Sequence, residues 1–175
     1  MKQKTCKVCK IKFIPTQFAQ VACNYKCAII HAKDLKKEKS VSAWKKEKSA
    51  LKESLLTKKD YLNILQKVFN TYIRQRDKGR PCISCGTLTG QMHAGHYRSV
   101  GSAPHLRFNE NNVHVQCATC NNFLHGNLIN YRRNLVQKIG IGKTEYIENY
   151  NETVKYSIDE VKDLIKLYKQ KIKDV

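Results

Sequence analysis

Two Cys-x-x-Cys pairs in the second half of the chain are the residues best suited to chemistry. Cys82 and Cys85 form the first pair, Cys117 and Cys120 form the second, and 31 residues lie between them. Each pair can wrap one edge of a metal ion from a short turn, and structural zinc sites hold four ligands in a tetrahedron. The spacing therefore predicts a structural zinc site.

A second group of four cysteines lies near the N-terminus. The first two precede a short hairpin that contains Phe13, and the last two fall on the first turn of a helix that begins near Asn24. This arrangement resembles a treble-clef zinc module, in which the ion replaces a core too small to hold itself together. We expect two structural zinc ions and reduced thiols, since the first residues carry no apolar secretion signal. The four N-terminal cysteines are Cys6, Cys9, Cys23 and Cys27.

The segment between the central cysteine pairs carries residues suited to phosphodiester hydrolysis. His96 lies early in it, Asn112 lies five residues before Cys117, and Asn121 directly follows Cys120. An unperturbed imidazole titrates near pH ~6.5 and can accept a proton at neutral pH, so His96 is the candidate base. Asn112 is expected to hold or orient the His96 ring, directly or through its backbone carbonyl. The amide oxygen of Asn121 is a hard ligand of the kind that magnesium prefers.

This order of residues resembles the HNH nuclease motif of the ββα-metal group, with that histidine and the two asparagines as its three letters. One position departs from the pattern. HNH motifs usually carry Asp, Glu or His directly before the base, and this chain has Gly95 there. His93 is the nearest substitute as a ligand of the catalytic metal, and His125 is a further candidate. The resemblance implies Mg²⁺ or Mn²⁺ as that metal, although two imidazoles shift the preference towards softer ions.

Further motifs extend over nearly the whole chain. They are the runs AGHYRS, HLRF, NNVHVQC and CNN, the pattern Gly126-Asn127-x-x-x-Tyr131-Arg132, and the N-terminal four-cysteine module. Together they resemble the lambdoid-phage NinG/Rap recombination endonucleases. The resemblance implies a phage-encoded, divalent-metal-dependent endodeoxyribonuclease. Its substrate would be branched DNA such as Holliday junctions and D-loops, cleaved during recombination at the nucleoid in the host cytoplasm.

The charge of the chain favours nucleic acid as the partner. There are 33 Lys and Arg against 14 Asp and Glu, a net charge of +19. A membrane is disfavoured because no stretch approaches the roughly 20 apolar residues of a spanning helix. No helix carries a row of base-reading side chains, so recognition by shape is expected. The expected phosphate contacts are Arg74, Arg76, Arg80, Arg98, Arg107, Arg132 and Arg133.

The elements that must position these residues are mostly helical. Residues 32–59 hold ten lysines among four acids and predict a solvated helix, which serves as a linker or as a phosphate-contacting arm. Capping boxes at Thr57 and Ser157 each start an amphipathic helix, and a third helix is expected from Asn127 to Ile139. The apolar face of the helix after Thr57 is expected to bury against the zinc-framed unit.

The predicted fold class is α+β, predominantly helical. A zinc-framed, HNH-like ββα-metal core is joined by the long basic helix to the N-terminal module. The predicted domains are residues 1–31, 32–59 and 60–175. Symmetric cleavage of a junction needs two active sites, so a homodimer is expected.

Two other functions are compatible with the sequence. A non-catalytic, zinc-containing DNA-binding protein that assists recombination would account for the charge and for Gly95. A zinc-organised adaptor for protein interactions would account for the cysteines but would leave the charge and His96 without a role. Cleavage assays separate the first alternative from an endonuclease, because that alternative predicts salt-sensitive binding without cleavage.

Overall fold

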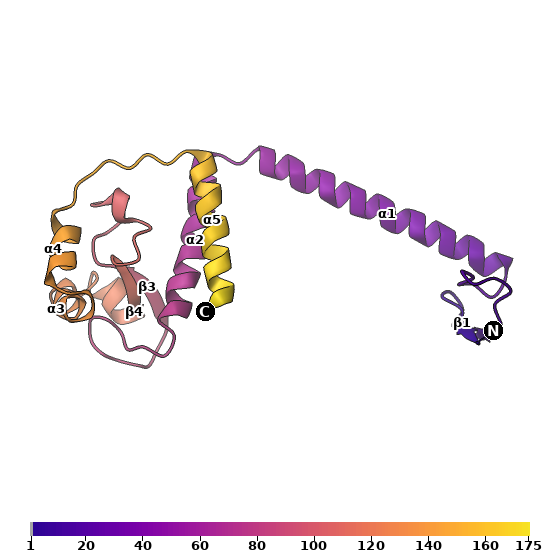
Figure 1. Cartoon of the computed structure of the whole chain (residues 1–175), viewed down its shortest axis with the longest axis horizontal. Coiled ribbons are helices and arrows are strands. Elements are labelled where there is room, and N and C mark those ends of the chain that lie inside the picture. The colour runs from indigo at the N-terminus through magenta and orange to yellow at the C-terminus, as the bar shows by residue number, and fades with distance from the viewer. Residues whose placement is uncertain (1) are drawn as a thin grey trace. The chain divides into compact units, whose positions relative to one another are not determined.

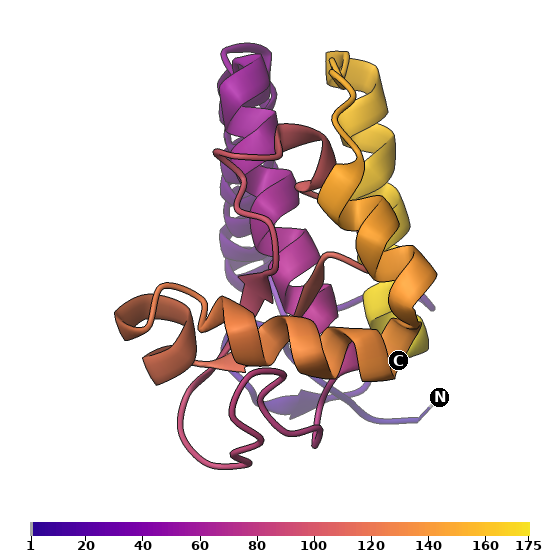
Figure 2. The same cartoon turned by 90° about the vertical axis from the view of Figure 1, so that its left-hand side faces the viewer.

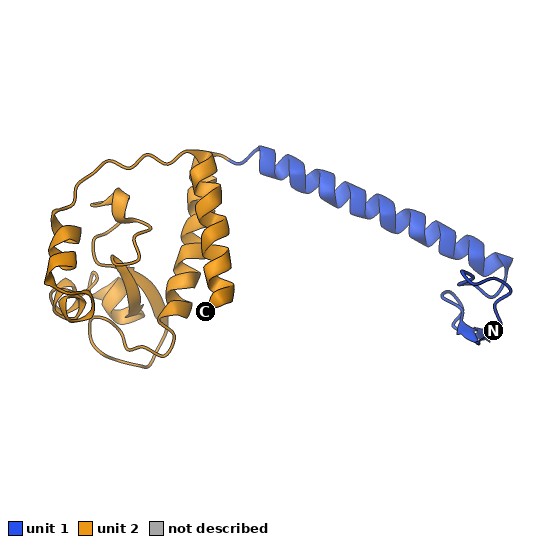
Figure 3. Cartoon of the chain, in the orientation of Figure 1, with its two compact units in different colours: residues 1–56 blue, residues 57–175 orange. Residues whose placement is uncertain are grey.

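The computed structural model describes residues 2–175 and divides the chain into two compact units, residues 1–56 and 57–175 (Figure 3). In the first unit, β1 (Lys4–Thr5) pairs antiparallel with β2 (Lys12–Phe13), which confirms the expected hairpin. The helix α1 (Tyr25–Ser54) follows. Its cap is Asn24, whose side chain accepts a hydrogen bond from the backbone N–H of Cys27 at 2.9 Å. The first turn of α1 therefore presents Cys27 to the hairpin.

The lysine-rich run continues α1 without a break (Figure 1). Cys27 is the helix's one buried residue within the described chain, and every residue from Ala32 to Ser54 is exposed. The run contains neither Gly nor Pro, so the helix propensity of its residues stabilises the helix in the absence of tertiary packing. This confirms the expectation of a long solvated helix. It also places that helix in the same compact unit as the N-terminal hairpin.

The second unit is built around two helices that lie side by side, α2 (Lys58–Arg76) and α5 (Ile158–Asp174) (Figures 1 and 2). Both begin with the expected capping box. Phe69 packs edge-on against Tyr168, with ring centroids 4.9 Å apart. The sequence-based expectation named the zinc-framed segment as the partner of α2. The structure corrects this, because α5 covers most of that apolar face and the central hairpin covers the rest.

The central hairpin consists of β3 (Met92–His96) and β4 (Val113–Cys117), with Met92 opposite Cys117 and His96 opposite Val113. A 3₁₀ turn, η1 (Pro104–Leu106), lies in the connection. After β4 come a π-helical turn, η2 (Thr119–Phe123), and the helices α3 (Leu128–Ile139) and α4 (Ile141–Asn149). Gly140 ends α3 at a φ of 86°, in the region that favours glycine. Two strands followed by a helix is the order expected from the sequence.

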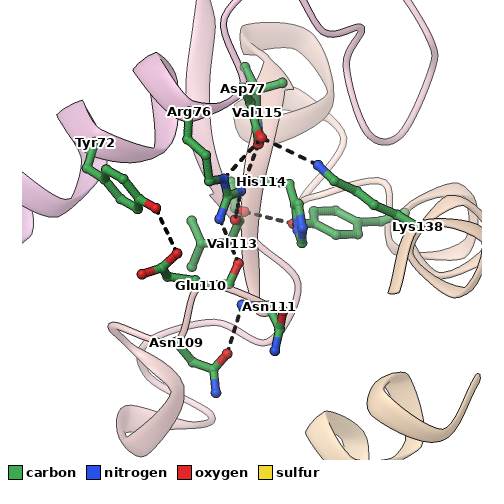
Figure 4. A network of polar contacts seen from close by, with 12 residues as sticks. Tyr72, Arg76, Asp77, Asn109, Glu110, Asn111, Val113, His114, Val115 and Lys138 are labelled. Atoms are coloured by element: carbon green, nitrogen blue, oxygen red, sulfur yellow. Dashed lines mark hydrogen bonds and ion pairs between the residues drawn. The ribbon is translucent and has the colours of Figure 1, made fainter. Parts of the chain in front are cut away.

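A buried polar network ties α2 to the hairpin and to α3 (Figure 4). Its centre is Asp77, which is 2% exposed and accepts hydrogen bonds from Arg76 at 2.8 Å and from the backbone N–H of Val115 at 3.1 Å. The ammonium group of Lys138 lies 3.5 Å away. Burial works to raise the pKa of Asp77, but the hydrogen bond and charge of Arg76 outweigh it and lower that pKa. The carboxylate is therefore ionised inside the fold.

Replacing Asp77 by alanine is expected to destabilise the second unit by about 3–5 kcal/mol, because Arg76 and Lys138 lose their shared carboxylate while they remain partly buried. Urea unfolding at neutral pH measures this loss. Asp163→Ala is the matched control, since Asp163 pairs with Lys166 on the exposed face of α5 and such pairs contribute at most about 1 kcal/mol. Equal losses in the two variants would show that the network does not hold these elements together.

Candidate functional site

The N-terminal cysteines form the first metal-ready cluster. The sulfur atoms of Cys6, Cys9, Cys23 and Cys27 all lie within 4.8 Å of one another. The Cys9–Cys23 and Cys23–Cys27 sulfur distances are 3.4 and 3.8 Å. In a zinc tetrahedron with bonds of about 2.3 Å, neighbouring sulfurs are ~3.8 Å apart, and a disulfide would need about 2.05 Å. The predicted cluster is therefore present, with the geometry that one zinc ion requires.

The central cysteines form the second cluster. Cys82, Cys85, Cys117 and Cys120 also lie with their sulfurs within 4.8 Å, and the Cys85 and Cys117 sulfurs are 3.7 Å apart. The backbone N–H of Cys120 donates to the sulfur of Cys117 at 3.4 Å, and Asn127 Nδ2 donates to that of Cys120 at 3.5 Å. Such donors stabilise thiolates around a metal. Because Asn127 also starts α3, the cluster couples β4 to that helix.

The thiol of Cys82 is prepared for ionisation. Burial works to raise its pKa, but backbone groups of Cys117, Cys85 and Ser84 lower it to about 7. A substantial fraction is therefore thiolate at neutral pH, the form that binds zinc.

His96, the expected base, ends β3 with its ring partly buried. Its Nε2 lies 3.0 Å from the carbonyl oxygen of Arg107. A carbonyl only accepts, so Nε2 carries the proton and Nδ1 holds a free lone pair. Burial lowers the pKa of His96, and the hydrogen bond to Arg107 opposes this only in part. The ring is thus held in a neutral, proton-accepting form.

Asn112 is fully buried and fixes the chain next to His96. Its Oδ1 accepts from the backbone N–H of Arg98 at 2.8 Å, and its Nδ2 donates to the carbonyls of Arg98 and Leu106 at 3.0 and 3.2 Å. The side chain of Asn112 holds the backbone that follows β3, and the backbone carbonyl of Asn112 accepts from the backbone N–H of Tyr97 at 2.8 Å. The carbonyl of Arg107 contacts the imidazole itself. The role of Asn112 in orienting the ring stays a prediction.

Asn121 lies in η2 and contacts His93 rather than His96. Its Nδ2 is 3.3 Å from His93 Nδ1 and 2.7 Å from Asn122 Oδ1. His93 comes from β3, so strand and π-helical turn bring together an imidazole and a carboxamide that are 28 residues apart in sequence. This contact is made by the amide nitrogen of Asn121. The atoms that would bind Mn²⁺ or Mg²⁺ are an imidazole nitrogen and the amide oxygen of Asn121. The two residues expected to bind the catalytic metal are therefore neighbours.

A hollow of about 360 Å³ opens beside His96. His125, the third candidate metal ligand, lines the same hollow from the loop before α3, with a φ of 46°. Glu148 lines it from α4, and its carboxylate accepts from Tyr97 and Arg132. Two imidazoles and a carboxylate therefore surround a space open to solvent.

The structure divides the predicted phosphate-binding arginines into three groups. Arg76 donates to Asp77 and to two backbone carbonyls, and Arg98 donates to the carbonyls of residues 147, 148 and 150. Arg76 and Arg98 therefore hold parts of the fold together, and their phosphate contacts stay predictions. Arg107 donates to Gln66, and Arg132, which is exposed, pairs with Glu148. The remaining three are also exposed: Arg74, Arg80 and Arg133.

Two polar residues inside β4 were missed by the sequence interpretation. His114 and Gln116 are 2% and 0% exposed and lie on the same face of the strand. Burial lowers the pKa of His114 to about 3, so its ring is neutral. The hydroxyl of Tyr131 donates its one proton to the carbonyl of Gly95, so His114 Nδ1 donates to the hydroxyl oxygen of Tyr131 at 3.3 Å. The sequence signal was the alternation of these residues with valines, which marks a strand with a polar but covered face.

Comparisons with known proteins agree with one another. A family model described as "Bacteriophage Lambda NinG protein" matches residues 1–175. Protein ninG of Escherichia phage lambda is 47% identical over 111 residues, which are 63% of this chain and 54% of that protein. Protein ninG of Salmonella phage P22 is 46% identical over 111 residues, 63% of this chain and 55% of that protein. The chain thus aligns with about half the length of these two relatives.

A third relative aligns over its full length. Protein ninG of Escherichia phage 933W is 34% identical over 188 aligned positions, which cover 99% of this chain and 94% of that protein. No solved structure matches the chain. Within the described residues, no helix is both long enough and apolar enough to span a bilayer.

Proposed function

The chain belongs to the bacteriophage lambda NinG protein family, and from that premise we propose that it is a metal-dependent endonuclease that cleaves branched DNA in phage recombination. The observation that carries the proposal is the grouping on β3. The strand holds a neutral imidazole with a free nitrogen at His96 and, three residues earlier, places His93 against Asn121. A base on the same strand as an imidazole that contacts a carboxamide provides the kinds of group that one-metal phosphodiester hydrolysis requires.

In this proposal His96 takes a proton from the attacking water. Its Nδ1 is the accepting atom, because Nε2 already donates to the carbonyl of Arg107. Asn112 holds the backbone of Arg98 and Leu106, so the loop that carries that carbonyl stays aligned with the strand. A divalent cation at His93 and Asn121, with His125 as a further candidate ligand, would neutralise charge on the scissile phosphate.

Phosphate binding falls to cations whose donors face solvent. Arg74, Arg80 and Arg133 are exposed in the second unit, and the lysines of α1 are exposed in the first. Each phosphate contact on duplex DNA adds about 0.9 to the slope of log affinity against log salt. Recognition of backbone shape suits a branched substrate, and symmetric cleavage of a four-way junction would require a homodimer.

A cleavage assay tests the proposal. Zinc-loaded protein is incubated with a four-way junction, a D-loop, duplex DNA and single-stranded DNA while Mg²⁺ or Mn²⁺ is titrated. We expect nicks in the branched substrates that depend on the added cation. Salt-sensitive binding without cleavage under every cation would favour the non-catalytic DNA-binding function instead. Two observations support that alternative: Gly95 offers no side chain as a metal ligand, and Arg76 and Arg98 donate to groups within the protein.

A further inference from the structure

The side-chain oxygen of Gln116 is buried and has no hydrogen-bond partner in the described part of the chain. Gln116 is fully buried in the middle of β4. Among the residues that the structure describes, its Oε1 is the one buried side-chain nitrogen or oxygen that lacks a hydrogen-bond partner. Buried polar groups are satisfied in the great majority of cases, so an unpaired carbonyl oxygen calls for a partner outside the protein, either a water molecule or a metal ion.

The orientation of the Gln116 amide is settled by its neighbours. Its nitrogen donates to Ser84 Oγ at 2.7 Å and to the carbonyl oxygen of Gly126 at 2.6 Å. If the amide were turned over, two oxygens would face each other at Gly126. The nitrogen side is therefore anchored, and Oε1 points to the opposite side.

On that opposite side lies Gly95 of β3, on the strand face that also carries His93. In the antiparallel register His93 is directly opposite Gln116, so the two side chains project from the same face of the hairpin. A Cβ atom on Gly95 would lie 2.2 Å from Gln116 Oε1. The oxygen thus occupies the space that a side chain at position 95 would fill, next to the residue that contacts Asn121.

We propose that Gln116 Oε1 is a ligand of the divalent cation that His93 and Asn121 bind. The inference rests on the proposed function and completes its site with a third donor. Gln116 Oε1, the imidazole of His93 and the amide oxygen of Asn121 form a mixed oxygen and nitrogen set that suits Mn²⁺ or Mg²⁺, with water and phosphate oxygens in the remaining positions. Binding in this way requires the amide of Asn121 to turn, because its nitrogen faces His93 in the structure. The anchored amide nitrogen holds the oxygen in place.

The same contacts explain why position 95 is glycine. Its φ lies outside the left-handed region, so the backbone there accepts any residue, and the exclusion of a side chain is purely steric. All three nearest atoms belong to the Gln116 side chain. Removing that side chain opens the space, and a carboxylate on residue 95 would then reach the position that Oε1 occupies.

Mn²⁺ binding to the zinc-loaded full chain tests the proposal, with free Mn²⁺ measured by electron paramagnetic resonance. Gln116→Met keeps the size of the side chain and removes the oxygen, and it is expected to weaken Mn²⁺ affinity about tenfold or more. Ser84→Ala is the matched control, because it removes a partner of the same amide but leaves Oε1 in place. Its affinity is expected to stay close to that of the parent. Equal affinities in Gln116→Met and the parent would overturn the proposal.

A ligand exchange gives a second test. Gly95→Asp alone is expected to bind Mn²⁺ poorly because its side chain collides with Gln116, whereas Gly95→Asp combined with Gln116→Ala is expected to recover affinity. A folded double variant that binds Mn²⁺ no better than Gln116→Ala would contradict the proposal.

The parent protein allows a third test that needs no substitution. Crystals grown with Mn²⁺ should show an anomalous peak within coordination distance of Gln116 Oε1, and a peak bound elsewhere would overturn it.

These outcomes separate the site from the activity. Cation binding at Gln116 without cleavage of any DNA would refute the proposed nuclease function and leave the metal site standing. Cleavage that persists in Gln116→Met at parental Mn²⁺ affinity would refute the metal site and leave the nuclease function standing.

Discussion

Replacing Cys117 by alanine is expected to unfold the central hairpin and release one zinc ion. Cys117 is buried at the end of β4, and its sulfur belongs to the quartet that joins the hairpin to the loop before it and the turn after it. Structural zinc binding contributes about 10–16 kcal/mol of apparent free energy, which equals or exceeds the net stability of a typical domain, about 5–15 kcal/mol. Little else covers this end of the unit, because Met92 is the one apolar neighbour packed on the cysteine cluster within the described residues.

Zinc content and circular dichroism during heating measure the effect. Cys9→Ala is the matched control, since Cys9 belongs to the other quartet, in the first compact unit. It is expected to release one zinc ion as well, while the thermal transition of the second unit stays where it is in the parent. A Cys117→Ala variant that retains two zinc ions and the parental transition would show that this cluster does not hold the fold.

Replacing His96 by alanine is expected to reduce cleavage of branched DNA by about 10²–10⁴-fold, the usual contribution of a positioned general base. DNA affinity should change little, because the ring is partly buried and its bonded nitrogen points to Arg107 rather than to solvent. Single-turnover cleavage and equilibrium binding to the same junction separate the two quantities. His31→Ala is the control, since His31 lies on α1 in the other unit.

The pH profile of cleavage gives the assignment a second readout. Protonated His96 cannot accept a proton, so the rate falls as the pH drops through its pKa. Burial lowers that pKa, and the falling limb is therefore expected below pH ~6.5, the ordinary value for histidine. The limb should be absent from the residual activity of His96→Ala. A variant with the parental rate or an unchanged acidic limb would assign the base to another residue.

Local patterns in the sequence were sufficient for the metal clusters and for most helix boundaries. Cysteines separated by two or three residues share one turn, so their spacing alone predicts that they face one ion, and both quartets are confirmed as metal-ready. The capping boxes at Thr57 and Ser157 and the stop at Gly140 are also local, because a cap involves only residues within one turn.

The roles of the charged and polar residues were decided by tertiary contacts. Arg98 was expected to bind phosphate, yet its guanidinium donates hydrogen bonds to carbonyls about 50 residues further along the chain. Asp77 contacts Lys138, which is 61 residues away in sequence, and α2 packs mainly against the last helix, α5. No spacing rule connects positions so distant, since their meeting depends on how the whole unit packs.

The sequence by itself therefore determined that the chain has two zinc-type clusters and a long basic helix. Only the tertiary structure decided that Asn121 lies against His93, that the carbonyl of Arg107 holds His96, and that Gln116 fills the space beside Gly95. The physical reason is the range of the interactions. Thiolate spacing and helix caps act within one turn, whereas a buried amide or arginine takes its role from whichever remote backbone groups the fold leaves within hydrogen-bond distance.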